Sequence, residues 1–124
     1  MRILVLLLLT LSLVGCNRFS FDHHLNSAYA AYDRGECEAA MLSLSKAERT
    51  SRSRRYMQPE ISLLRGQCLE RQALFVDAMQ TYQFILTTYP ASEYAYRARA
   101  RLDTLRQLGH DANAAAVKAT PVAP

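Results

Sequence analysis

The spacing of small and apolar residues is the strongest constraint on the fold of this chain. From Leu25 to Leu105 they recur three and four residues apart, which is the periodicity of one face of an α-helix. No segment alternates apolar and polar residues as a half-buried strand does, and no Asn-Gly or Asp-Gly pair marks a β-hairpin. The sequence therefore predicts an all-α fold.

Turn and capping residues divide this pattern into five predicted helices. The first ends near Gly35, the fourth stops before Pro90, and the fifth begins after Ser92, a good N-cap, and ends near Gly109. The positions expected to face the core are, helix by helix, Leu25, Ala28, Ala31 and Tyr32; Ala39, Ala40, Leu42, Leu44 and Ala47; Ile61, Leu64, Cys68 and Leu69; Phe75, Ala78, Met79, Tyr82, Ile85 and Leu86; and Ala95, Ala98, Leu102 and Leu105.

The first four predicted helices form two pairs that repeat with an offset of 38 residues. The matching positions are Ala28 and Gly66, Ala31 and Leu69, Gly35 and Ala73, Cys37 and Phe75, Ala40 and Ala78, Leu44 and Tyr82, and Ala47 and Ile85. Small residues let two helices approach closely, and larger ones fill the space between them. The two pairs are therefore expected to pack in the same way.

This pattern resembles the tetratricopeptide repeat (TPR). Gly66, Leu69, Ala78, Tyr82 and Pro90 match the family pattern, whereas His24 and Ser62 stand where it often has Trp, and no Pro closes the first pair. The stretch from Tyr82 to Leu102 is also similar to helical-repeat lipoproteins of outer-membrane assembly machines. The resemblance implies a short TPR-like α-solenoid over residues 21–109, with two helix pairs and a C-terminal capping helix.

The N-terminus predicts export. A basic start at Arg2 precedes an apolar run from Ile3 to Val14, as in a secretory signal peptide. Leu13-Val14-Gly15-Cys16 resembles the lipobox of bacterial lipoproteins. That resemblance implies cleavage after residue 15 and diacylglycerol and N-acyl lipid on Cys16; the alternative is an ordinary signal peptide with a coincidental cysteine. Asn17, where an Asp would favour retention in the inner membrane, favours the outer membrane, facing the periplasm.

Two segments flank the predicted helical domain. Residues 16–20 are expected to be a lipidated tether, and the Ala- and Pro-rich residues 110–124 a disordered tail. Of the cysteines, Cys37 and Cys68 remain once Cys16 carries lipid. In an oxidising compartment they form either a disulfide or two buried thiols.

Two surfaces are candidates for binding. The TPR resemblance implies a concave face that holds a partner, formed here by Tyr29, Tyr32, Asp33, Gln67, Glu70, Arg71, Arg97 and Arg101. The alternatives are packing for Tyr32 and ordinary solvation for the charged residues. A second candidate is the cluster Arg49, Arg52, Arg54 and Arg55, which with Tyr56 suits peptidoglycan, another anionic polymer or lipid head groups. Its alternative is a solvated loop between the repeats.

Neither catalysis nor a cofactor is indicated. No Gly-x-Ser-x-Gly, His-Glu-x-x-His or phosphate-binding loop occurs, and the adjacent His23 and His24 make a poor metal pair on a helix. Without Arg2 the net charge falls from +4 to +3, too weakly basic to indicate nucleic acid binding. We therefore expect a non-enzymatic adaptor for an envelope assembly, secretion or polymer-export complex, with an unidentified protein partner. Two repeats bury little core, so a homo-oligomer is a further alternative.

Overall fold

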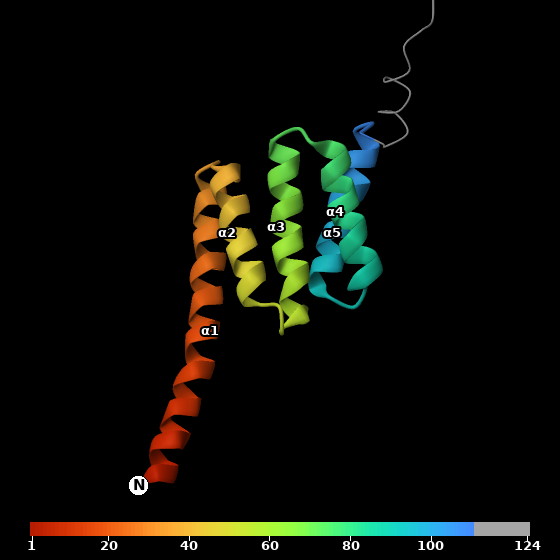
Figure 1. Ribbon diagram of the computed structural model, residues 1–124. Helices are drawn as coiled ribbons and strands as arrows, with labels where there is room; N and C mark the ends of the chain where they lie inside the picture. Colours follow the sequence, from red (N-terminus) through yellow and green to blue (C-terminus); the bar gives the residue numbers. More distant parts are fainter. Residues whose placement is uncertain (111–124) are drawn as a thin grey trace, which may run out of the picture. The chain divides into compact units, whose positions relative to one another are not determined.

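The computed structural model describes residues 1–110, except for the side chains of residues 8–17. Within this part of the chain the secondary structure is entirely helical, so the predicted all-α fold is confirmed (Figure 1). The elements are α1 (Arg2–Asp33), α2 (Cys37–Thr50), the 3₁₀ helix η1 (Arg55–Met57), α3 (Gln58–Arg71), α4 (Phe75–Thr88) and α5 (Glu93–Gln107). The chain forms two compact units that meet in the sequence between Ile61 and Ser62.

Helix α1 is longer at its N-terminal end than the sequence analysis predicted. It runs without interruption for 32 residues, and residues 16–20, the expected tether, are helical. This stretch contains no proline, and one glycine inside a helix costs only about 1 kcal/mol. The side chain of Cys16 and the tail from residue 111 lie outside the described residues. Among the residues that are described, no helix is long and apolar enough to cross a membrane.

The first unit is built on the hairpin of α1 and α2. Helix α1 buries Phe21, Leu25, Ala28 and Ala31, and α2 buries Cys37, Ala40, Leu44 and Ala47. The prediction that Ala39 and Leu42 face the core is wrong: both are exposed, Leu42 by 58%. Leu42 lies two residues after Ala40, about 200° around the helix, and therefore points to the opposite side.

The second unit places α3, α4 and α5 around one hydrophobic core. Its buried members are Leu63, Ala78, Met79, Tyr82, Ile85, Ala95, Ala98, Leu102 and Leu105. Gly66 lets the Tyr82 ring pack directly against α3: a Cβ atom built on Gly66 would lie 2.5 Å from Cε1 of Tyr82. The tyrosine ring of α4 therefore occupies the space that a side chain at position 66 of α3 would need.

The turns inside the two hairpins have the same geometry, 38 residues apart. The Gly35 N–H donates to Tyr32 O and the Glu36 N–H to Ala31 O; the Ala73 N–H donates to Glu70 O and the Leu74 N–H to Leu69 O. Both are Schellman motifs, in which the residue after the C-cap takes a left-handed conformation. The φ angles are +79° at Gly35 and +59° at Ala73. The repeat seen in the sequence therefore extends to the backbone of the turn.

The fifth helix begins and ends as predicted. The Ser92 hydroxyl accepts a 3.1 Å hydrogen bond from the Ala95 N–H, so Ser92 is the N-cap. At the other end, Gly109 has a φ of +78° and its N–H donates to Arg106 O. Helix α4 ends at Thr88, two residues before Pro90, as the ring of a proline requires.

Replacing Ala73 by Gly is expected to stabilise the protein by about 0.5–1 kcal/mol. An L-residue in the left-handed region costs about 1–2 kcal/mol, and glycine avoids this cost while losing more backbone entropy on folding. Urea unfolding followed by circular dichroism measures the change. Ala100→Gly, at an exposed position inside α5, is the control and should destabilise by about 1 kcal/mol. Equal losses at both positions would contradict the assignment of the turn.

Candidate functional site

The eight residues predicted to form the partner face divide between the two units. In the first unit, Tyr29, Tyr32 and Asp33 lie in the last turns of α1. Tyr29 is half-buried and its hydroxyl donates a 2.8 Å hydrogen bond to Oε1 of Glu60 at the start of α3. Tyr32 is half-buried and Asp33 is exposed. The polar tip of Tyr29 is thus already used inside the unit.

In the second unit, the structure brings two of the five predicted residues, Glu70 of α3 and Arg101 of α5, into contact. Nε of Arg101 on α5 donates a 3.0 Å hydrogen bond to Oε1 of Glu70 on α3, and a second guanidinium nitrogen pairs with Oε2. Such a two-point pair holds a planar guanidinium in one orientation. We call the surface formed by Gln67, Glu70, Arg71, Arg97 and Arg101 the α3–α5 face.

Tyr82 of α4 supports this ion pair from inside the core. Its side chain is fully buried, and its hydroxyl donates a 2.6 Å hydrogen bond to Oε1 of Glu70. Burial, followed by the neighbouring Glu70 carboxylate, raises the pKa of Tyr82 above its ordinary value. The hydrogen bond from Arg101 to Glu70 raises the pKa of Arg101, although partial burial acts in the opposite direction. The core position of Tyr82 follows from helical spacing, but its polar role does not, and its phenolic oxygen is the only sign of that role in the sequence.

The geometry decides which groups the α3–α5 face offers to a partner. The side chain of Glu70 is only 10% exposed, whereas that of Arg101 is 44% exposed. Arg71 and Arg97 are exposed and Gln67 is half-buried. The guanidinium carbon of Arg97 lies 6.0 Å from the centroid of the Tyr94 ring, at the edge of cation–π range. The face therefore offers mainly guanidinium groups.

Removing the Glu70 carboxylate should destabilise the protein. In Glu70→Ala, the buried hydroxyl of Tyr82 and the guanidinium of Arg101 lose their acceptor, and unfolding should become easier by about 1.5–3 kcal/mol. Urea unfolding measures the change. The matched control is Glu93→Ala, which removes an exposed carboxylate from α5 and should cost less than about 1 kcal/mol. Equal losses in the two variants would mean that the buried hydrogen bond contributes nothing.

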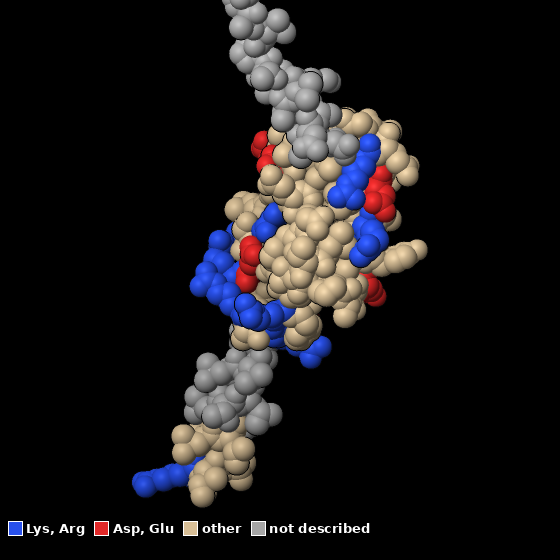
Figure 2. Space-filling view, turned by 90° about the vertical axis from the view of Figure 1, so that its right-hand side faces the viewer, with Lys and Arg blue, Asp and Glu red and all other residues tan. Residues whose placement is uncertain are grey.

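The predicted arginine cluster lies at one end of the first unit. Arg49, Arg52 and Arg55 are exposed, and Tyr56 is 69% exposed. The guanidinium carbon of Arg54 lies 5.3 Å from the centroid of the Phe21 ring on α1, so the loop is held against that helix. Figure 2 shows Lys and Arg side chains gathered where the N-terminal half of α1 leaves the hairpin. We call Arg18, Arg49, Arg52, Arg54 and Arg55 the basic patch.

The remaining candidate groups form no further constellation in the described part of the chain. Cys37 and Cys68 are buried thiols rather than a disulfide, which is the second of the two alternatives raised for them. The rings of His23 and His24 meet edge to face with centroids 5.4 Å apart. No group of three or more metal-ligating side chains occurs among the described residues.

Comparison with known proteins adds no further constraint. No protein-family model, no curated protein and no solved structure matches this chain. The sequence motifs and the geometry of the two surfaces are therefore the features from which a function can be inferred.

Proposed function

We propose that this chain is a non-enzymatic lipoprotein, anchored through Cys16 to the periplasmic side of a bacterial outer membrane. Its TPR-like helices would bind a protein partner of an envelope assembly, secretion or polymer-export complex. The observation that carries the proposal is the α3–α5 face, where side chains of two helices are held in fixed positions by the pair of Glu70 and Arg101. Such preorganised side chains lose little entropy when a partner binds.

The charges of this face indicate the chemistry of the partner segment. Glu70 neutralises Arg101, and Arg97 adds a further exposed guanidinium group to the face. Tyr94, beside Arg97, contributes an aromatic ring of the kind that is enriched at protein interfaces. We therefore expect the partner to present an acidic segment that the guanidinium groups can bind through pairs of hydrogen bonds.

Site-specific crosslinking in intact cells tests the partner. A photoreactive residue at position 97 should give one discrete crosslinked product, and Arg71→Glu should weaken it. The control position is 99, which is also an exposed arginine of α5 but lies about 200° further around the helix. An equal yield from positions 97 and 99, or no product from position 97, would contradict a partner on this face.

The anchor is tested separately by intact mass spectrometry of the membrane fraction. The proposal expects a chain that lacks residues 1–15, carries three acyl chains, and loses them in Cys16→Ser. An unacylated mature chain would contradict the anchor and leave the crosslinking result to decide the adaptor role alone.

A further inference from the structure

The basic patch lies close to the residue that would carry lipid. Helix α2 has 14 residues and packs antiparallel on α1, so the end of α2 lies beside the residue reached by counting back the same length from Asp33. That residue is Ser20, four positions after Cys16. Four residues of helix rise by about 6 Å. The Arg-rich loop after α2 is therefore about one helical turn from the predicted anchor point.

One contact shows that the loop lies against this part of α1, and the charges near His24 agree with it. Arg54 stacks over the ring of Phe21, the residue after Ser20. The pKa of His24, one turn further along α1, is lowered by partial burial and then by the charges of His23, Lys46 and Arg49. Positive potential thus surrounds this end of α1 from both helices. Asp22 and Glu48 lie in the same region. The patch therefore contains charges of both signs, with the positive charges in excess.

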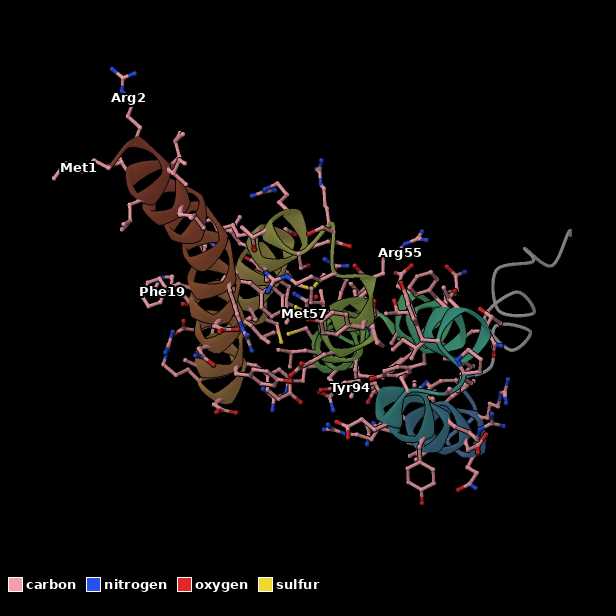
Figure 3. The ribbon with its side chains drawn as sticks, turned by 90° about the horizontal axis from the view of Figure 1, so that it is seen from below. Met1, Arg2, Phe19, Arg55, Met57 and Tyr94 are labelled. Atoms are coloured by element: carbon pink, nitrogen blue, oxygen red, sulfur yellow. The ribbon has the colours of Figure 1, made fainter. Side chains whose placement is uncertain are left out.

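Exposed aromatic rings accompany the arginines. Phe19 is 77% exposed and Tyr56 is 69% exposed. In Figure 3, Phe19 projects from α1 on the side away from α2, and Arg55 projects outward from the loop. Aromatic rings next to basic residues are typical of surfaces that lie at the boundary between lipid head groups and water.

We propose that the basic patch, together with Phe19 and Tyr56, docks on the anionic phospholipid surface that holds the Cys16 anchor. The acyl chains keep the loop within a few ångströms of the head groups, and the arginines bind their phosphates. Docking fixes the end of the hairpin at the membrane and leaves the opposite end, at Gly35, directed away from it. The inference rests on the proposed anchoring at Cys16 and adds an orientation to it.

Lipid quenching of a fluorophore in the loop tests the contact. Ser53 is exposed, whereas Cys37 and Cys68 are buried, so a thiol-reactive dye labels the Ser53→Cys protein in the loop. The labelled full-length protein, processed in cells and reconstituted, is placed in phosphatidylcholine vesicles with or without phosphatidylglycerol, each containing a head-group spin label. We expect strong quenching in the anionic vesicles only, and its loss at 1 M salt, where electrostatic interactions extend about 3 Å.

Two matched triple variants distinguish the effect of the basic patch on docking from the effect of the net charge of the protein. Arg49, Arg52 and Arg55 change to Ser in the first variant, which keeps the Arg54 contact with Phe21. In the control, Arg34, Arg99 and Arg106 change to Ser, which removes the same charge from exposed positions elsewhere. The first variant should reduce the ratio of docked to undocked loop roughly a hundredfold, and the control should not change it.

Each other outcome is decisive. Equal quenching in both triple variants, or no quenching of the parent protein in anionic vesicles, would overturn the proposal. Sedimentation with purified peptidoglycan that depends on the three arginines, without lipid quenching, would assign the patch to a polymer instead. An unacylated mass would contradict the anchor alone. In that case the same labelled protein is mixed with preformed vesicles. Quenching must then still depend on phosphatidylglycerol and on the three arginines; without that dependence, the proposal for the basic patch fails as well.

Discussion

Tyr82→Ala should lose about 3–5 kcal/mol of unfolding free energy, the range for truncating a large buried aromatic side chain. Tyr82 is fully buried and packs among the three helices of the second unit. The loss of the ring leaves a cavity beside Gly66, and Glu70 loses the hydrogen bond that the Tyr82 hydroxyl donates to it. Small proteins have only about 5–15 kcal/mol of total stability, so this one change should bring the chain close to unfolding.

Urea unfolding of the full chain measures this effect, and Tyr82→Phe is the matched control. The phenylalanine keeps the ring and loses only the hydroxyl, so it should cost about 0.5–1.5 kcal/mol. Glu70 keeps its pair with Arg101 in this variant. If Tyr82→Phe cost as much as Tyr82→Ala, the hydrogen bond rather than packing would dominate the contribution of this residue.

Gly66→Ala should be destabilising, by about 1–3 kcal/mol, although alanine favours helix more than glycine does by about 1 kcal/mol. The new Cβ would lie 2.5 Å from the Tyr82 ring, well inside van der Waals contact. The ring cannot easily move aside, because its hydroxyl is held by Glu70 at 2.6 Å. The steric conflict therefore outweighs the gain in helix propensity.

A second substitution, taken from the first hairpin, should restore the stability of the Gly66→Ala variant. Its matching positions are Ala28 and Leu44, and both are fully buried. Gly66→Ala combined with Tyr82→Leu reproduces that pair in the second hairpin. The unfolding free energy of this double variant should equal that of Tyr82→Leu or exceed it by up to about 1 kcal/mol. If the alanine cost the same in both backgrounds, the contact with Tyr82 would not be the reason.

Most of the helical architecture could be predicted because it depends on local residue patterns. The apolar spacing gave the helix positions, Pro90 and Ser92 marked the fourth boundary, and Gly35 and Gly109 marked two C-terminal ends. Apolar spacing alone placed the end of the third helix at about Gln72, since no glycine marks this end and Ala73 is the residue that takes the positive φ. Its conformation follows from the alignment with Gly35.

The candidate surfaces were predictable only in part. Helical periodicity placed Arg97 and Arg101 on one side of α5, and the repeat placed Glu70 on the same helix as Gly66. The sequence could not show that Glu70 and Arg101 satisfy each other, since 31 residues separate them and their distance depends on how α3 and α5 pack. Leu42 was also predicted to be core, because it is apolar and lies between Ala40 and Leu44 in the sequence, although it points to the opposite side of α2.

The sequence by itself determined the helical class and the repeat with an offset of 38 residues, because both depend on local patterns of small and apolar residues along the chain. Tertiary structure alone decided three other features: the burial of Tyr82 against Gly66, its hydrogen bond to Glu70, and the stacking of Arg54 on Phe21. Those contacts join residues on different elements of the fold, and the packing of their side chains sets the distances between them.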